Sequence, residues 1–190
     1  MSRSSVVLRD ATAADAPALA ELWHDVLRRA DPAEQEADLV TLIGRLDPQS
    51  ERLVVAEYDG EVAGAVMLKA TTATPLNLEP LVQAVSPHVL PAYRRRGVGR
   101  ALVEAAVVFA EERGIGHVGS GALSASRDAN RFLARLGLGP QAVLRAGPTA
   151  TVRSRLDALK PTKSRARQIS QVLAVRRSQR HRDAAPAPKG

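Results

Sequence analysis

Residues 85–102 read Val-Ser-Pro-His-Val-Leu-Pro-Ala-Tyr-Arg-Arg-Arg-Gly-Val-Gly-Arg-Ala-Leu, and this stretch decides the fold. The run over 81–90 predicts a strand, and the residues after the stretch's glycines predict a helix over about 98–113. Between them, Arg94-x-x-Gly97-x-Gly99 forms a turn rich in arginine and glycine. The first N–H groups of a helix have no partners inside the helix, and the helix dipole favours an anion there. The stretch therefore predicts a phosphate-binding site at the start of the helix.

Glycine and arginine have different roles in this predicted site. Gly97 and Gly99 carry no side chain, so a diphosphate can approach the backbone. Positive charge surrounds them, from Arg94, Arg95, Arg96 and Arg100. A solvated basic turn before a surface helix is the alternative interpretation, and charge and glycine alone leave it open.

Strands alternate with helices on both sides of this segment, which indicates an α/β or α+β fold. Further strands are predicted over 6–9, 52–58, 61–68, 115–120 and 141–145, and further helices over 13–29, from Asp31-Pro32 onward, over about 126–136 and over 149–159. Asp59-Gly60 is a hairpin turn signal between two of the strands. Pro87 inside the 81–90 strand demands an edge position, a bulge or a splayed pair.

The net positive charge of the chain comes from its C-terminal part. The formal net charge is +7 over 190 residues. Residues 158–190 contain nine Lys or Arg residues and one acidic residue, so 18 basic and 19 acidic residues remain in 1–157. We therefore expect a nearly neutral domain over 1–157 and a basic tail over 158–190 that is either helical or disordered.

Several classes of protein are excluded by composition. Cysteine is absent, which excludes disulfides, thiolate metal sites and a cysteine nucleophile. The four histidines have no ligand spacing, so no metal is expected. No apolar run is long enough to span a membrane, and the first residues lack the apolar core of a signal peptide. We therefore expect a reducing, cytoplasmic location.

The segment after Val89 resembles the acyl-CoA motif of the GNAT N-acetyltransferases, (Q/R)xxGx(G/A). The resemblance covers about 5–145 and rests on four segments: Arg9-x-Ala11-Thr12-x-x-Asp15, Asp59-Gly60-x-x-x-Gly64, Val89-x-Pro91-x-Tyr93-Arg94-x-x-Gly97-x-Gly99-x-x-Leu102 and Ala129-x-x-Phe132-x-x-x-x-Gly137-Leu138. It implies a mixed central sheet that is splayed at strand 81–90 and flanked by helices, within an acyltransferase domain over 1–157.

The resemblance also implies a co-substrate and residues that hold it. Acetyl-CoA, or another acyl-CoA, would lie in the gap of the sheet, and a primary amine would attack its thioester carbonyl. Backbone groups of Pro87, His88 and Val89 would pair with the pantetheine arm, although Pro87 has no N–H and offers only its carbonyl. An N–H near Val89 would stabilise the oxyanion. The diphosphate would be held by the N–H groups of Arg95, Arg96, Gly97, Val98, Gly99 and Arg100.

Three positions depart from the family's pattern. Leu133 stands where many members have a tyrosine, Ser126 where they often have an asparagine, and Gly121 where some have a glutamate base. A thiolate can take its proton from water, so the missing tyrosine is tolerable. Ser126, like Ser124, is expected to cap the late helix, and it could also reach CoA.

The missing glutamate leaves the catalytic base open. Glu79, just before the 81–90 strand, is our candidate, and a solvated loop carboxylate is its alternative role. His88 beside the cofactor is a second candidate, although a structural role is the default for it. A chain of water molecules that carries the proton without any side chain is the third alternative. His24 and His117 are interpreted as ordinary fold residues, and Trp23 as a core residue.

Two function classes remain after these observations. The first is an N-acetyltransferase that acts on a small-molecule or protein amine. Whether this enzyme forms a homodimer is left open by the sequence. The second is a catalytically weak acyl-CoA-binding module that uses its tail to contact a partner. Nucleic-acid binding by the tail is a weaker alternative because no aromatic residue is present there to stack on bases.

Overall fold

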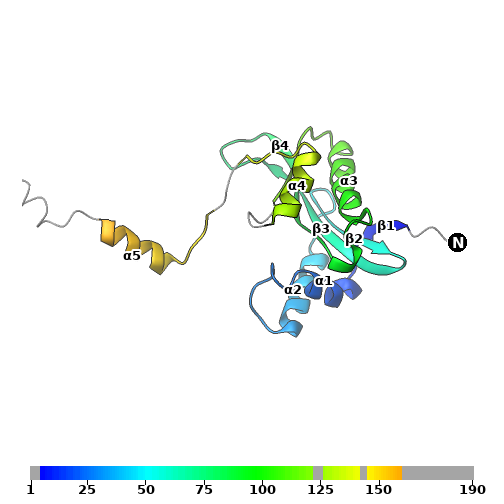
Figure 1. The fold of residues 1–190 in the computed structure, drawn as a ribbon, viewed down its shortest axis with the longest axis horizontal. Coiled ribbons are helices and arrows are strands. Elements are labelled where there is room, and N and C mark those ends of the chain that lie inside the picture. The colour runs from blue at the N-terminus through cyan, green and yellow to red at the C-terminus, as the bar shows by residue number, and fades with distance from the viewer. Residues whose placement is uncertain (1–4, 122–125, 142–144, 160–190) are drawn as a thin grey trace, which may run out of the picture. The chain divides into compact units, whose positions relative to one another are not determined.

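The computed structural model describes residues 5–121, 126–141 and 145–159 (Figure 1). The strands are β1 Val6–Asp10, β2 Glu51–Tyr58, β3 Glu61–Thr72, β4 Pro80–Val89 and β5 Val118–Ser120, and the α-helices are α1 Ala16–Leu22, α2 Pro32–Gly44, α3 Val98–Glu111, α4 Arg127–Arg135 and α5 Thr149–Leu159. The predicted alternation of strands and helices is confirmed.

The chain divides into two compact units, 1–141 and 142–190. The first unit contains the sheet and the helices α1 to α4, and the second contains α5. The strand predicted over 141–145 and the basic tail lie largely outside the described residues. The predicted boundary between 157 and 158 therefore stays a prediction.

The sheet is mixed, with the strand order β1-β2-β3-β4-β5. The first four strands are antiparallel neighbours, and β5 runs parallel to β4. Asp59 and Gly60 both have positive φ, 53° and 85°, at the turn between β2 and β3. A two-residue turn of this kind matches the twist of a hairpin, and the predicted hairpin signal is confirmed.

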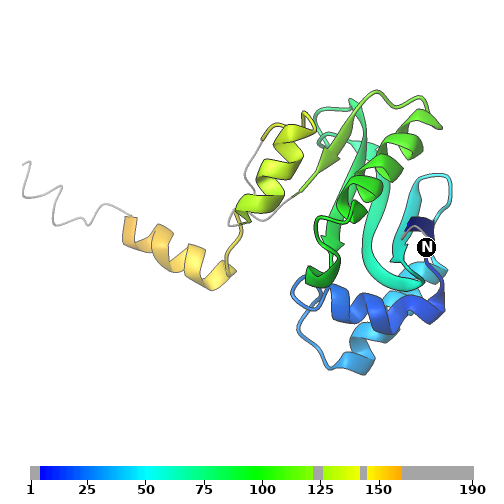
Figure 2. The ribbon, with the colours of Figure 1, turned by 45° about the vertical axis from the view of Figure 1, so that its right-hand side comes forward.

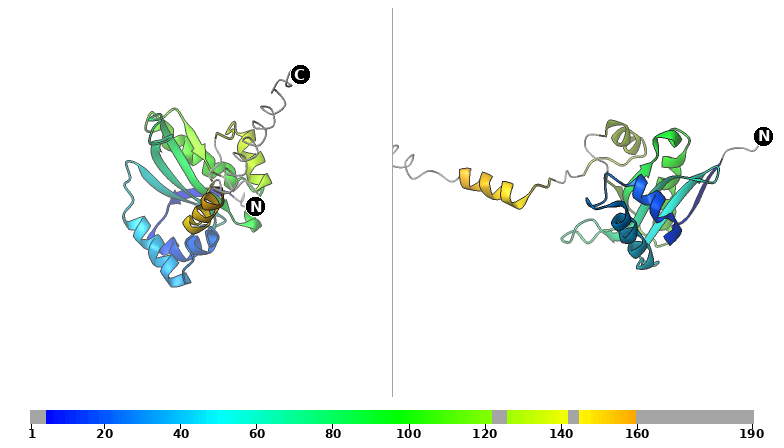
Figure 3. Two further views of the ribbon diagram at one scale, coloured as in Figure 1. Left: turned by 90° about the vertical axis from the view of Figure 1, so that its left-hand side faces the viewer. Right: turned by 90° about the horizontal axis from the view of Figure 1, so that it is seen from below.

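Each face of the sheet carries its own helices (Figures 2 and 3). Successive side chains of a strand point to opposite faces. Val54 accordingly packs in the cluster that includes Leu102 and Phe109 of α3, and Val55 packs with Leu19 of α1 and Leu39 of α2. The sheet is therefore the middle layer, between α3 and the pair α1 and α2.

The first helix is shorter than its periodicity predicts. A 3-10 turn, η1 Ala13–Asp15, leads into α1, which ends at Leu22 instead of near residue 29. Trp23 is only 4% exposed, and its indole N–H donates to the carbonyl of Ser86 at 2.9 Å. This bond fixes Trp23 to β4, and the chain continues from there in turns rather than in a helix.

The predicted break in the 81–90 strand is a bulge in β4. Val85 pairs with Met67 and His88 pairs with Ala65, so Ser86 and Pro87 together face a single residue of β3. Ser86 has a φ of 47°, which L-residues rarely adopt. Of the three alternatives that Pro87 left open, the structure contains the bulge.

A charged cluster joins β1 to the start of the first helical segment. Arg9 donates to both carboxylate oxygens of Asp15, at 2.8 and 2.7 Å, and to Glu57 at 2.6 Å. The Asp15 carboxylate also accepts from the backbone N–H of Thr12 at 2.7 Å. These contacts, mainly the one with Arg9, lower the pKa of Asp15 to about 2. Burial acts in the opposite direction, because only 8% of the Asp15 side chain is exposed.

Asp15→Asn is expected to lower the free energy of unfolding at pH 7 by about 2 kcal/mol, because the folded-state pKa of Asp15 lies below its unfolded value. This stabilisation is present above pH 4 and is lost as the pH falls from about 4 toward 2. Urea unfolding at pH 7 and pH 2.5 measures it, with the exposed Asp25→Asn as control. A difference between wild type and variant that stays constant down to pH 2.5 would contradict the assignment.

Candidate functional site

The described pairs between β4 and β5 cover only the first half of β4. The pairs between β4 and β5 are Val82 with Val118, Gln83 with Gly119 and Ala84 with Ser120. At the last of these pairs, the Ser120 hydroxyl donates a hydrogen bond to the Ala84 carbonyl at 3.3 Å. β4 continues to Val89, and within the described ranges no residue of β5 pairs with 85–89. Residues 85–89, about 13 Å of β4, therefore have no partner among the described residues of β5, and we call them the open stretch. The expected splay stays a prediction because 122–125 lie outside the described residues.

The backbone of Val89 faces this open side. A Cβ built on Gly64 of β3 would lie 2.5 Å from the carbonyl oxygen of His88, and Leu90 donates its N–H to Ala63 at 2.9 Å. The backbone groups of His88 and Leu90 therefore face β3. Consecutive residues of a strand direct their N–H and C=O groups to opposite sides, so those of Val89 point away from β3.

The first turn of α3 lies next to Val89. Gly97 precedes the helix with a φ of 89°, and Ala101 makes the first backbone bond of the helix, to the carbonyl of Gly97 at 3.0 Å. The N–H groups of residues 98–100 thus precede the first intrahelical bond. A Cβ built on Gly99 would lie 3.7 Å from a methyl group of Val89, so the predicted anion site and the open strand adjoin.

Helix α4 borders the same region. The Phe132 ring lies 3.8 Å from a Cβ built on Gly99, whereas Leu133 is buried with 7% exposure. Ser126 precedes α4, but its side chain makes no cap hydrogen bond, so the prediction of a side-chain cap is wrong for it. The backbone carbonyl of Ser126 accepts a hydrogen bond from the Asn130 side chain at 2.7 Å. Ser124 lies outside the described residues.

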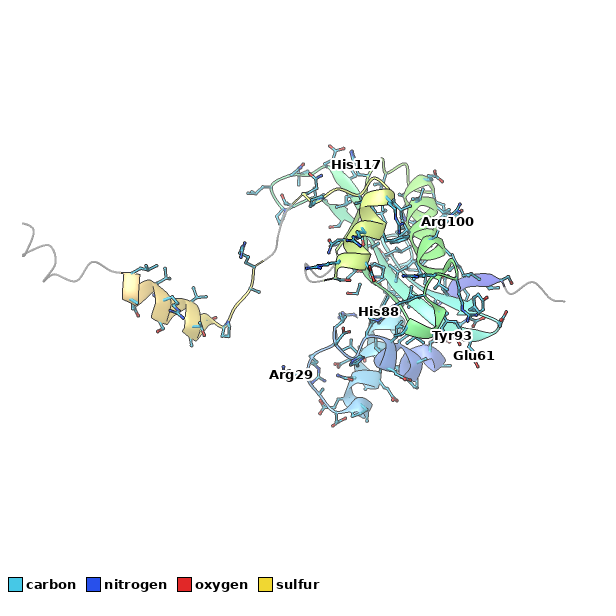
Figure 4. The ribbon with its side chains drawn as sticks, in the orientation of Figure 1. Arg29, Glu61, His88, Tyr93, Arg100 and His117 are labelled. Carbon is cyan, nitrogen blue, oxygen red and sulfur yellow. The ribbon has the colours of Figure 1, made fainter. Side chains whose placement is uncertain are left out.

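The four arginines of the turn are not equivalent. Arg94, Arg95 and Arg100 are exposed beside the start of α3, where Figure 4 labels Arg100. The Arg96 guanidinium lies over the ring of Tyr58, 5.1 Å from its centroid. The charge of Arg96 is therefore directed to β2, while its backbone belongs to the anion-binding turn.

The structure separates the two candidate bases. Glu79 precedes the closed end of β4, about 26 Å along the strand from Pro87, and its carboxylate lies 3.4 Å from Nδ1 of His117. His88 lies on the open stretch, opposite Ala65, whose side chain is buried against α1 and α2. Cross-strand partners share a face, so His88 projects toward these helices. Figure 4 shows His88 and His117 well apart.

In the described part of the chain, no group of three or more His, Asp or Glu side chains is placed to hold a metal ion. No helix in the same part is both long and apolar enough to cross a membrane.

A protein-family model decides which family this site belongs to. The model of the acetyltransferase (GNAT) family matches residues 16–138, which span the bulged strand, the glycine turn and α4. The chain belongs to the GNAT acetyltransferase family. The expectation of an acyltransferase is thereby confirmed.

Solved structures support the fold of this GNAT acetyltransferase. A transcriptional regulator from Bacillus halodurans is 22% identical with a TM-score of 0.64, over 76% of this chain and all (100%) of that one. The aminoglycoside N-acetyltransferase AAC(6')-Iy in complex with CoA is 17% identical with a TM-score of 0.65, over 78% of this chain and 97% of that one. A ribosomal-protein-alanine N-acetyltransferase from Brucella melitensis is 19% identical with a TM-score of 0.57, over 76% and 99%. No curated protein shows significant sequence similarity.

One contact of the site was missed by the sequence analysis. Core packing was the default expectation for Trp23, with a wall of the acceptor pocket as the lesser option, and Trp23 is buried in the core. Its hydrogen bond to Ser86 also ties α1 to the bulge of β4. A buried indole N–H needs an acceptor, so the tryptophan at the end of an apolar stripe was a signal for such a bond.

Proposed function

We propose that this GNAT acetyltransferase moves an acetyl group from acetyl-CoA to a primary amine of a small molecule or a protein. One observation carries the proposal. The backbone N–H groups that open α3 adjoin the stretch of β4 that lacks a described partner in β5. A diphosphate fits the first feature and an extended pantetheine arm fits the second. The solved neighbour in complex with CoA supports the choice of co-substrate.

Individual residues fit the parts of such a ligand. Arg95 to Arg100 would offer backbone N–H groups to the diphosphate, and Gly97 and Gly99 leave the approach open. Val89 would offer its N–H to the thioester oxygen, while Pro87 offers only a carbonyl. Acetyl-CoA supplies the activated acyl group.

A proton acceptor is needed because an alkylammonium ion is no nucleophile until it loses a proton. In the proposed reaction the amine nitrogen forms a bond to the acetyl carbon, the carbon–sulfur bond breaks, and the thiolate takes a proton. His88 is our candidate acceptor, because it lies on the open stretch of β4 and projects toward α1 and α2. We favour His88 over Glu79, because Glu79 lies at the other end of the strand.

The variant Arg94→Glu/Gly99→Val is expected to abolish CoA binding. The first change reverses a charge beside the turn, and the second adds γ-carbons where a Cβ already contacts Val89 and Phe132. Isothermal titration calorimetry with CoA measures the loss, with exposed Arg45→Glu as the charge-matched control. Micromolar binding by the double variant would overturn the assignment.

The acyl-CoA-binding module remains a second candidate because of Leu133. This residue occupies the position of the family's tyrosine and is packed in the core. Thiol release from acetyl-CoA with a panel of amines separates the two functions. Release with any acceptor supports the enzyme, and CoA binding without release supports the module. The panel includes aminoglycosides and alanine of ribosomal proteins, since two of the structural neighbours are named for these acceptors.

A further inference from the structure

A cluster of four side chains connects the β2–β3 hairpin to the anion-binding turn. We call it the hairpin latch, and it consists of Tyr58, Glu61, Tyr93 and Arg96. Tyr93 donates its hydroxyl to the Glu61 carboxylate, the rings of Tyr58 and Tyr93 lie 5.7 Å apart, and Arg96 covers Tyr58 at 5.1 Å. Figure 4 shows Glu61 and Tyr93 beside each other. The latch joins segments that are about thirty residues apart in the chain.

The rings of Tyr58 and Tyr93 pack against the core on the α3 side of the sheet, but packing alone does not account for the polar contacts of the latch. Glu61 and Arg96 are exposed, and Tyr93 is half-buried. A hydrogen bond to a carboxylate is stronger than one between neutral groups, and a cation over an aromatic ring adds further attraction. The Glu61 contact also raises the pKa of the Tyr93 phenol, so its hydroxyl keeps the proton that it donates.

The segment that the latch holds needs support. Arg95 and Gly97 have φ values of 63° and 89°, and a residue with a side chain rarely adopts such a conformation. The latch attaches to Tyr93 just before this segment and to Arg96 inside it. Both attachments restrict how the N–H groups after Arg95 are directed.

We infer that Tyr58, Glu61 and Tyr93 are positioning residues for the diphosphate of CoA. They hold the turn in the conformation whose amides bind the anion. The Arg96 guanidinium contacts Tyr58 instead of the phosphates, while the Arg96 backbone N–H stays part of the turn. This inference rests on the proposed function, because it assumes that the turn binds CoA. It predicts that damage to the latch affects only those donors that carry a diphosphate.

The test compares two acyl donors. S-acetylpantetheine has the thioester and the pantetheine arm of acetyl-CoA but lacks the diphosphate. In the variant Tyr58→Leu/Tyr93→Phe, KM for acetyl-CoA is expected to rise about tenfold, which corresponds to about 1.4 kcal/mol, while kcat/KM for S-acetylpantetheine stays unchanged. Tyr58→Phe keeps the ring under Arg96, and Glu61→Gln keeps an acceptor for Tyr93 but loses its charge, so each should raise KM for acetyl-CoA less than the double variant does.

Two outcomes overturn the latch. One is an unchanged KM for acetyl-CoA, and the other is an equal loss with both donors, which would mean general damage to the fold. Calorimetric Kd values for CoA give the same comparison without transfer. If the wild type binds CoA but transfers nothing, the proposed transfer fails, and a tenfold weaker Kd in the double variant still supports the latch. An unchanged Kd overturns it.

Discussion

His88→Gln is expected to lower kcat for acetyl transfer by about 100-fold or more, the range in which positioned acids and bases contribute. Glutamine keeps the backbone N–H and C=O of residue 88 and can still form hydrogen bonds, but it takes no proton from an ammonium ion. The Kd for CoA should stay near the wild-type value. The His88 carbonyl faces β3, and its side chain projects toward α1 and α2, so the substitution leaves the anion-binding turn before α3 unchanged. Steady-state kinetics and calorimetry on the same variant measure both quantities.

Matched variants at the other end of β4 sharpen this test. His117→Gln and Glu79→Gln remove an exposed pair that lies away from the open stretch, and both should keep wild-type kcat. Adding imidazole to a His88→Ala variant should restore part of the lost rate, because free imidazole supplies the missing acceptor. Wild-type kcat in His88→Gln, or a large loss in Glu79→Gln, would refute the assignment of His88.

Gly64→Ala is expected to lower the free energy of unfolding by about 3 kcal/mol and to weaken CoA binding with it. A Cβ at this position would lie 2.5 Å from the His88 carbonyl oxygen, 3.1 Å from the Val98 side chain and 3.3 Å from the Val89 backbone. The two backbone atoms belong to adjacent residues of β4 and cannot give way cheaply, so β4 must shift away from β3. The shift moves the same Val89 that lines the open side of the sheet.

Gly44→Ala is the control for this substitution. A Cβ there would meet nothing within 4 Å, and Gly44 ends helix α2, where alanine is the better helix former. The control should match or slightly exceed the wild type in urea unfolding. A Gly64→Ala protein with wild-type stability would show that β3 and β4 are not so closely apposed at this point.

Local sequence signals predicted most of the fold. Asp31 accepts the Glu34 N–H at 2.8 Å at the start of α2, as its position before Pro32 predicts. The hairpin at Asp59-Gly60 and the break at Pro87 also follow from single residues with restricted backbones. The end of α1 could not be predicted in this way, because a bond to Ser86, far along the chain, fixes Trp23.

The candidate site was predicted in its backbone and less well in its side chains. The turn before α3 and the strand that ends at Val89 lie together because they are adjacent in sequence. The sequence does not show where the pairing of β4 with β5 begins, so it could not place Glu79 beside His117, about 26 Å along the strand from Pro87. Arg96 likewise counted as charge for the phosphates, and only the folded chain brings Tyr58 beneath it.

Pro87 has a consequence for how the protein behaves among its own copies. A strand that lacks a neighbour is a template for edge-to-edge aggregation, and proteins guard such edges with proline and bulges. The open part of β4 contains both, at Ser86 and Pro87. Because Pro87 has no N–H, an intruding strand could not form a complete ladder of hydrogen bonds here, so this part of β4 is a poor template for pairing with a second copy.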